Sequence, residues 1–359
     1  MSAATSFDVF RLHGGKVAAA RALFPQVSAP WIDLSTGISP WSYPHAAIPA
    51  EAFTRLPDPE AIDALEAAAA VSFGAPDAAC VIATPGSDLA LRLLGRLFTG
   101  RRVAVVRPGY SGHVLAWGES EITLIPADDI EVAARAHDVV ILANPNNPDG
   151  RVVSRERLLA VAAELGARGG MLIVDEAFAD VMPEHSLCGV LSDSVMVFRS
   201  FGKFFGLAGV RLGFVVTACS RTRRALRSAL GDWPVSGPAV AIGTAAYRDV
   251  NWQSMQRQRL NAAAERLDAM LVRAGLAVAG GTLLFRLARC ESGVRGDAAT
   301  GLGTGASERT AEALFKHLAQ HGILTRPFSS DASLLRFGLP ADETHWQRLA
   351  IAMASRGSP

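Results

Sequence analysis

Residues 200–213 combine the residue types that covalent chemistry on a carbonyl compound requires. They read Ser-Phe-Gly-Lys-Phe-Phe-Gly-Leu-Ala-Gly-Val-Arg-Leu-Gly, so Lys203 and Arg211 are the charged residues of an otherwise uncharged segment. Burial and a neighbouring cation both lower the pKa of an amine, and an unprotonated amine attacks an aldehyde to form a Schiff base. The segment therefore predicts Lys203 as the reactive amine, with Arg211 as the neighbouring cation and phosphate ligand. The alternative is a loop lysine between two core strands.

Two polar motifs follow short apolar runs upstream of this segment. Asp175 comes directly after the run 171–174, at a strand end, which is where α/β sheets bind their ligands. An aspartate at this place can also simply cap the next helix. Residues 144–150 read Asn-Pro-Asn-Asn-Pro-Asp-Gly, and three asparagines are more than a turn requires. This makes Asn147 a candidate ligand for a polar group.

Two further motifs suit a flat, phosphorylated ligand. Gly86 and Ser87 begin a helix, and the free backbone N–H groups of a helix N-terminus bind phosphate, although an ordinary N-cap has the same sequence. Tyr110 follows the next strand in the order Pro-Gly-Tyr. Its ring either stacks on a planar ligand or belongs to the apolar core.

The C-terminal part of the chain contains two candidate anion ligands. Arg336 lies within the apolar run 334–337, and a guanidinium buried there without an anion would be costly. Arg326 lies in a neighbouring strand-like run and is a second candidate, which a surface salt bridge explains about as well. A carboxylate or phosphate on a substrate would satisfy either arginine.

Together these motifs resemble the class I/II aminotransferases of pyridoxal 5′-phosphate (PLP) fold type I. The hallmark of that family is Ser-x-x-Lys followed by a Gly-rich run and Gly-x-Arg-x-Gly, and residues 200–213 have every hallmark position. The resemblance implies PLP as cofactor, held by Lys203 as a Schiff base, with Asp175 facing the pyridinium nitrogen so that the ring withdraws electrons. It further implies that Gly86, Ser87, Ser200 and Arg211 bind the cofactor phosphate, that Tyr110 stacks on the ring and that Asn147 binds its 3′-oxygen.

Several segments resemble one branch of the family, the L-threonine-O-3-phosphate decarboxylases of cobalamin (vitamin B12) biosynthesis. They are His13-Gly14-Gly15, residues 33–41, Phe178 in place of the more common Tyr, and residues 233–247. The resemblance extends over residues 10–350. It implies decarboxylation of L-threonine O-3-phosphate to (R)-1-aminopropan-2-ol O-2-phosphate, with Arg336, Arg326 and His13 as substrate-binding residues.

Three positions depart from the relatives. Ser39 stands where they commonly have Asn, and Leu56 stands where many have a Tyr that reaches the partner subunit's cofactor phosphate. Phe178 has no hydroxyl to donate to the 3′-oxygen, so Asn147 would make that contact alone.

The cofactor motifs leave two alternative functions open. A histidinol-phosphate-type aminotransferase also needs a second anion site, and decarboxylation and transamination share every cofactor contact named above. A catalytically inactive fold-type-I partner protein is the alternative from another class. The intact Asp175, Lys203 and Arg211 favour an enzyme.

The elements that must position these residues alternate between helical segments and short apolar runs. The runs at 103–106, 139–142, 171–174, 195–198 and 214–216 are typical of strands buried on both faces of a mainly parallel sheet. The predicted fold is therefore α/β, with a smaller α+β C-terminal domain. We expect an N-terminal segment over 1–40, which by the family resemblance packs on the active site and small domain, a large domain over 41–235 and the small domain over 236–359. A stripe of Leu89, Leu93, Leu94 and Leu97 predicts the buried face of a helix, and 291–306 reads as a mobile surface loop.

Composition points to a small-molecule ligand. A net charge of +1, from 35 basic and 34 acidic residues, gives no reason to expect nucleic acid or an anionic membrane as partner. The four cysteines lack paired metal-ligand spacing, so we expect reduced thiols, no metal site and a cytoplasmic location. The chain shows no signal-peptide pattern, and the family resemblance implies a homodimer.

Overall fold

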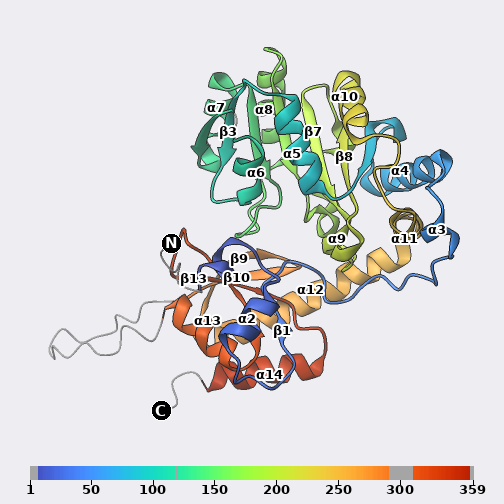
Figure 1. Cartoon of the computed structure of the whole chain (residues 1–359). Helices are drawn as coiled ribbons and strands as arrows, with labels where there is room; N and C mark the ends of the chain where they lie inside the picture. The colour runs from blue at the N-terminus through green and yellow to red at the C-terminus, as the bar shows by residue number, and fades with distance from the viewer. Residues whose placement is uncertain (1–6, 119, 291–309, 356–359) are drawn as a thin grey trace. The chain divides into compact units, whose positions relative to one another are not determined.

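The computed structural model describes residues 7–118, 120–290 and 310–355 (Figure 1). The chain divides into two compact units. The large unit comprises Ser42–Arg257, and the small unit comprises Met1–Trp41 together with Gln258–Pro359. The segment 291–306, predicted to be a surface loop, lies outside the described residues.

A seven-stranded sheet forms the centre of the large unit, in the order β2-β8-β7-β6-β5-β3-β4. Five neighbouring strands, from β7 to β4, run parallel, and β8 pairs antiparallel with both β7 and β2. The prediction of a mainly parallel sheet is thus confirmed. The strands are β2 (Val81–Thr84), β3 (Arg102–Val106), β4 (Glu121–Ile125), β5 (Val139–Ala143), β6 (Met171–Asp175), β7 (Val195–Ser200) and β8 (Gly213–Thr217).

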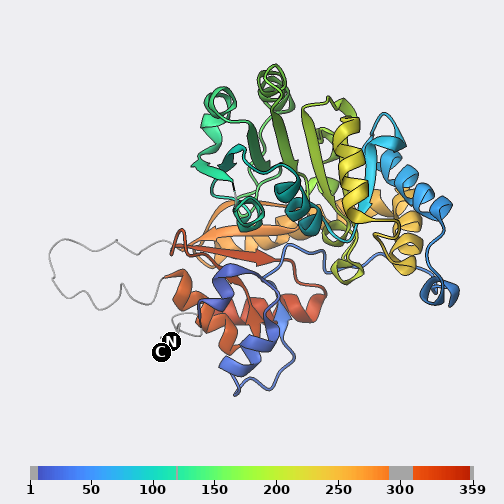
Figure 2. The same cartoon turned by 45° about the horizontal axis from the view of Figure 1, so that its top comes forward.

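Helices cover both faces of this sheet because successive strand residues are apolar and point to opposite faces. Figures 1 and 2 show α5 and α10 side by side over one face, where Leu91, Leu94 and Trp117 pack on strand residues such as Phe198. On the other face, Phe73 of α4 and Tyr247 of α11 contact Phe214. The helices of this unit are α3 (Glu51–Thr54), α4 (Pro59–Phe73), α5 (Ser87–Leu97), α6 (Ser111–Ala116), α7 (Ile130–Ala136), α8 (Arg155–Gly166), α9 (Phe201–Phe204), α10 (Ser220–Leu230) and α11 (Gly237–Arg248).

The predicted buried stripe of α5 is wrong at its two ends. Leu89 and Leu97 are 43% and 40% exposed, whereas Ala90, Leu91 and Leu94 are buried. The cause is Gly95, where a Cβ would lie 1.9 Å from the carbonyl oxygen of Ala116. Close approach of α6 at this glycine accompanies a buried face of Ala90, Leu91 and Leu94, so that of the predicted stripe Leu94 is buried and Leu93 is partly buried against the core.

The boundary between the units differs from the prediction. Residues 236–257 belong to the large unit rather than to the small domain, because α11 packs along α4. The boundary falls instead within α12 (Val250–Arg273). The N-terminal segment belongs to the small unit, where Phe7 and Phe10 pack against the ring of Phe315.

The small unit is α+β, as predicted. Its four-stranded antiparallel sheet has the order β12-β13-β10-β9, and β1 pairs in parallel with β11. Its strands are β1 (Ile32–Asp33), β9 (Ala277–Thr282), β10 (Phe285–Arg289), β11 (Ile323–Leu324), β12 (Arg326–Pro327) and β13 (Leu334–Gly338). Its helices are α1 (Val9–Leu12), α2 (Val17–Leu23), α13 (Ala311–Gln320), α14 (Glu343–Ala354) and the C-terminal part of α12.

Within the described ranges, no helix has both the length and the apolar character needed to cross a bilayer. Cys80, Cys188 and Cys219 are free thiols, and Cys80 and Cys188 are buried.

Candidate active site

The predicted cofactor residues of the large unit meet at one edge of its sheet. Strands β3, β5, β6 and β7 run parallel and end at this edge, and the register pairs both Ser200 and Thr84 with Gly213 at the start of β8. The loops after β2, β3 and β5 carry Gly86, Tyr110 and Asn147, while β6 and β7 end at Asp175 and Ser200. The sequence therefore brings these residues together through topology, at the edge where α/β sheets bind their ligands.

Gly86, Ser87 and Arg211 form a narrow cradle at the N-terminus of α5. Gly86 is the N-cap residue with φ 89°, and a Cβ on it would lie 2.7 Å from Arg211 Nη2. Arg211 is the one non-glycine residue of the described ranges with a positive φ, 56°. A Cβ on Gly213 would lie 2.4 Å from the backbone nitrogen of Ser87. Free N–H groups beneath a guanidinium are suited to a phosphate.

Tyr110 stands at the beginning of α6 with its hydroxyl oriented by α5. The hydroxyl donates to Asp88 Oδ1 at 3.0 Å, and burial together with Asp88 raises the pKa of Tyr110 above its ordinary value. A Cβ on Gly112 would lie 2.2 Å from the Tyr110 ring, so the ring needs a glycine two residues later. The tyrosine is only part-buried, which fits a ring held at the surface of a site better than a core residue.

Asp175 contacts a histidine that the sequence analysis did not identify. His113 of α6 is fully buried, and its Nε2 lies 3.0 Å from Asp175 Oδ2. A carboxylate only accepts, so Nε2 carries the proton. Asp175 Oδ1 accepts from the backbone N–H of Ala177 at 3.1 Å. The signal available in the sequence was the spacing Tyr110-x-x-His113, which places both rings on one side of a helix start, where they meet edge to face at 5.5 Å.

The three asparagines of the loop after β5 have different partners. Asn144 exchanges two hydrogen bonds with the backbone of Val153, at 2.8 and 3.1 Å, and so closes the loop. Asn146 donates to the carbonyl oxygen of Pro108 at 3.0 Å and thereby fixes the Tyr110 loop beside it. Asn144 and Asn146 are therefore structural. Asn147 is half-buried on the same loop.

Lys203 lies on the single-turn helix α9, three residues after Ser200. Its Nζ is 5.9 Å from the ring centre of Phe178, which is buried on the loop that follows Asp175. Gly202 is required here because a Cβ would lie 2.6 Å from the Cα of Ala208. The surroundings of Lys203 thus include the buried ring of Phe178, and α9 itself carries two buried phenylalanines, Phe201 and Phe204.

In the small unit, the two predicted arginines occupy directly paired positions. The register of β12 and β13 pairs Arg326 with Arg336. Arg336 is 2% exposed and donates from Nη2 to the carbonyl oxygen of Ser35 at 2.8 Å. Burial, followed by the charge of Arg326, lowers the pKa of Arg336 to about 9. Two cations on adjacent strands, one of them buried, form a site prepared for anions.

The N-terminal Gly-Gly segment lies against these arginines within the small unit. Arg326 Nη2 donates to the carbonyl oxygen of Leu12 at 3.0 Å, directly before the exposed His13. The backbone N–H of Gly15 donates to Ser35 Oγ at 2.8 Å, and a Cβ on Gly14 would lie 2.3 Å from the Ser35 carbonyl oxygen. Ser35 therefore contacts both Arg336 and the two glycines that follow His13.

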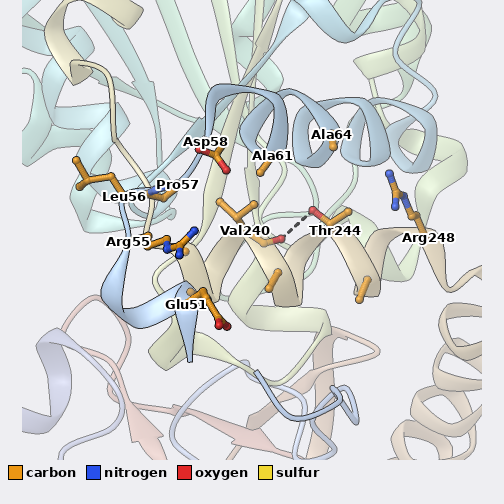
Figure 3. A pocket seen from close by; sticks show the side chains of 14 residues that line it. Glu51, Arg55, Leu56, Pro57, Asp58, Ala61, Ala64, Val240, Thr244 and Arg248 are labelled. Atoms are coloured by element: carbon orange, nitrogen blue, oxygen red, sulfur yellow. Dashed lines mark hydrogen bonds between the residues drawn. The ribbon is translucent and has the colours of Figure 1, made fainter. Parts of the chain in front are cut away.

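Leu56 lies beside a separate groove on the large unit, with a cavity volume of about 540 Å³ (Figure 3). Ala61 and Ala64 of α4 face Val240 and Thr244 of α11 across it. Glu51, Asp58, Arg55 and Arg248 line its ends. Leu56 and Phe53, three residues apart in sequence, are 63% and 66% exposed.

Comparison with known proteins places the chain in a family. The family profile described as "Aminotransferase class I and II" matches residues 30–355. The threonine-phosphate decarboxylase of Pseudomonas aeruginosa is 42% identical over 97% of this chain and 98% of its own length. The threonine-phosphate decarboxylase of a Sinorhizobium species is 37% identical over 96% of this chain and 97% of its own length.

A solved structure shows the same fold. The histidinol-phosphate aminotransferase from Sinorhizobium meliloti, in complex with pyridoxal 5′-phosphate, matches with a TM-score of 0.75 at 22% identity, covering 94% of each chain. This likeness confirms the predicted PLP-dependent transferase fold type I. With the motifs assembled at one sheet edge and a family profile matching most of its length, the chain belongs to the class I and II aminotransferase family.

Proposed function

We propose that this protein is a PLP-dependent carboxy-lyase that decarboxylates L-threonine O-3-phosphate to (R)-1-aminopropan-2-ol O-2-phosphate. The observation that carries the proposal is the 42% identity to a threonine-phosphate decarboxylase along nearly the whole of both chains. The paired arginines of the small unit agree with it, because this substrate has a carboxylate and a phosphate and so needs two cations.

The residues at the edge of the large sheet fit PLP. The cradle of Gly86, Ser87 and Arg211 would hold its phosphate, since a side chain on Gly86 would fill the space in front of the guanidinium. Ser200 would add a hydroxyl to the same group. Tyr110 would stack on the ring, and Asn147 would bind the 3′-oxygen without help from Phe178, which lacks a hydroxyl. When bound, PLP supplies an electron sink for the bond that breaks at the substrate Cα.

Asp175 and Lys203 would perform the chemistry that the protein contributes. The Asp175 carboxylate, oriented by Ala177 and His113, would keep a proton on the ring nitrogen that faces it. Lys203 Nζ would hold the cofactor before substrate arrives and, once released, deliver a proton to Cα as carbon dioxide leaves. One carboxylate is thus replaced by one proton, and no keto acid is consumed.

Substrate binding would use the small unit. Arg336 and Arg326 would bind the carboxylate and the phosphate of threonine phosphate, and His13 would make a further polar contact from the N-terminal segment. Unphosphorylated threonine would leave one cation without its anion, and an unpaired buried partner costs more than a lost contact at the surface. The enzyme is therefore expected to prefer the phosphorylated amino acid.

The experiment that tests the proposal supplies the holoenzyme with one substrate at a time. With L-threonine O-3-phosphate and no keto acid, we expect release of carbon dioxide and the amine phosphate in equal amounts. Histidinol phosphate with 2-oxoglutarate is the matched assay for the alternative reaction. Glutamate from that pair, without carbon dioxide from threonine phosphate, would establish an aminotransferase instead. Absence of any absorbance near 420 nm would favour the inactive partner protein.

We also propose that the protein forms a homodimer. Two exposed apolar side chains, Phe53 and Leu56, lie near the groove described above, which is lined by alanines and has acidic and basic residues at its ends. Such a surface can complement a second copy of itself across a two-fold axis. Sedimentation velocity should give a dimer that Leu56→Asp weakens.

The proposed product, an amino alcohol phosphate, suggests a role in cobalamin biosynthesis. The free thiols of Cys80, Cys188 and Cys219 suit the cytoplasm.

A further inference from the structure

A buried ion cluster lies behind the candidate active site. We call Arg199, Glu176 and Asp180 the Arg199 cluster, and each of the three is at most 4% exposed. Arg199 Nη1 donates to Glu176 Oε2 at 3.0 Å, and Nη2 donates to Asp180 Oδ1 at 2.5 Å. The guanidinium also lies 4.4 Å from the ring centre of Phe73.

The strand register connects this cluster to the site. Glu176 directly follows Asp175, and Arg199 directly precedes Ser200. Neighbouring side chains on a strand point to opposite faces, so the ion pair lies behind Asp175 and Ser200. The register pairs Asp175 with Phe198, and the N–H of Glu176 donates to the Phe198 carbonyl oxygen at 2.9 Å. Each end of the ion pair is thus one residue from a proposed cofactor ligand.

The cluster also closes the loop that follows Asp175. Glu176 accepts from Ser186 Oγ at 2.5 Å and from the backbone N–H of Leu187 at 2.7 Å. Asp180 lies within this loop, two residues after Phe178, whose ring is beside Lys203. Its carbonyl oxygen accepts from Arg257 Nε at 2.7 Å. The residues that Arg199 binds are thus adjacent in sequence to Asp175 and two residues from Phe178, and Arg199 itself precedes Ser200.

Stability alone does not explain the cluster. Removing charges from water is costly, and buried ion pairs can often be replaced by apolar residues without loss of stability. Asp180 Oδ2 and Arg199 Nε have no hydrogen-bond partner within the described residues. Burial raises the pKa of Glu176, although Arg199 opposes the shift. Such an arrangement is better suited to fixing geometry than to lowering the free energy of folding.

We propose that Arg199 is a positioning residue that, through Glu176 and Asp180, sets the end of β6 against the end of β7. It thereby fixes the geometry of Asp175 relative to Ser200 and Lys203. Only the expected effect on kcat rests on the proposed function; the effect on the geometry of the site does not. Misplacing a catalytic group by about 1 Å can cost about 100-fold in rate, so a small relaxation is measurable.

The experiment compares four holoenzyme variants with the wild type. Glu176→Gln is nearly isosteric, Arg199→Lys keeps the charge, and the triple variant Arg199→Met, Glu176→Gln, Asp180→Asn removes every charge of the cluster. Glu66→Gln is the matched control, since Glu66 is also buried in the large unit, where it binds Arg227 Nη2 at 2.7 Å and the N–H of Ala83 at 2.9 Å. The readouts are the melting temperature, the absorbance spectrum of the bound cofactor against pH, and kcat and KM.

We expect the triple variant to keep a melting temperature close to that of Glu66→Gln. Its cofactor absorbance should titrate at a pH shifted by about half a unit or more, and kcat should fall about tenfold or more with KM changed less than about threefold. Arg199→Lys should recover part of the kcat. If the triple variant does not fold, the same shifts in Glu176→Gln and Arg199→Lys decide the question.

An unchanged absorbance titration and unchanged kcat in the cluster variants, with only a lower melting temperature, would overturn the proposal and leave a structural role. Failure of the proposed function gives a different result. In that case the wild type would release no carbon dioxide from threonine phosphate, while the absorbance titration, which needs no substrate, would still report on the cluster.

Discussion

Asp175 illustrates how much of the site depends on individual contacts. Its two carboxylate oxygens have separate partners, the N–H of Ala177 and Nε2 of His113, and its side chain is 15% exposed. A carboxylate oriented from two sides can present a fixed charge to a ring nitrogen. His113 supports that orientation without being exposed itself.

Replacing Asp175 by Asn removes the charge but keeps the shape, so the cofactor should still bind. Turnover should fall about 1000-fold, on the order of 4 kcal/mol in the barrier, because the ring nitrogen loses the charge that holds its proton. Single-turnover carbon dioxide release at saturating substrate measures this. His113→Gln, which loses only the orienting contact, should cost less than Asp175→Asn. Near-normal turnover in Asp175→Asn would mean that another residue faces the ring nitrogen.

Lys203→Ala should abolish the covalent link to the cofactor while the phosphate cradle remains. Borohydride reduction of the wild type should then attach the cofactor to the peptide that contains Lys203, and the variant should remain unlabelled. Peptide mapping by mass spectrometry is the measurement. A label on any other lysine would disprove the assignment.

At the scale of elements, the phosphate cradle depends on how closely β8 approaches α5. Gly213→Ala would place a Cβ 2.4 Å from the backbone nitrogen of Ser87, where only a backbone shift relieves the clash. We expect the affinity for PLP to fall about tenfold or more, because the N–H groups lose their alignment. Gly209→Ala is the control, since nothing lies within 4 Å of its Cβ. Equilibrium dialysis compares the two, and equal affinities would contradict the role of Gly213.

The elements that could be predicted from sequence are those indicated by residues close together in the sequence. The apolar runs that became β3, β5, β6, β7 and β8 each have a Gly, Pro, Asn or Asp within two residues of at least one end, so their apolar pattern and their turn residues indicate the same strands. The motifs at their ends were visible for the same reason. Asn147, Asp175 and Ser200 each stand at or just after a strand end, and the parallel topology alone brings such positions together.

Other features depend on tertiary approach and so leave no local signal. The buried face of α5 is set by Gly95 against α6, which a periodicity in the sequence of α5 cannot reveal. The pairing of Arg199 with Glu176 depends on the register between β6 and β7, which the sequence of neither strand shows by itself. The boundary between the two compact units differs from the predicted domain boundary, because the sequence of α11 does not show its packing on α4.

Considered as a whole, the molecule divides its proposed tasks between its two units. The large unit contains every proposed cofactor ligand, and the small unit contains Arg326 and Arg336. Without a bound substrate, the small unit holds the buried guanidinium of Arg336 beside that of Arg326. Because the pKa of Arg336 is lowered to about 9, the folded protein holds this proton less tightly than the unfolded chain does. Below about pH 9 this charge reduces the free energy of unfolding, and the reduction lessens as pH rises through 9 toward the ordinary arginine pKa.

An anion that binds Arg336 should reverse this cost, so threonine phosphate should raise the melting temperature of the holoenzyme at pH 7. At about 100 times its dissociation constant a ligand adds roughly 2.7 kcal/mol to stability. Arg336→Met removes the buried charge, so the ligand-free variant should be at least as stable as the wild type but should lose most of the response to threonine phosphate. Arg266→Met is the matched control in the small unit, since Arg266 pairs with Glu343 at the surface, and it should keep the full response. Differential scanning calorimetry of all three proteins with and without ligand provides the measurement. A full response in Arg336→Met would show that the substrate anions bind elsewhere.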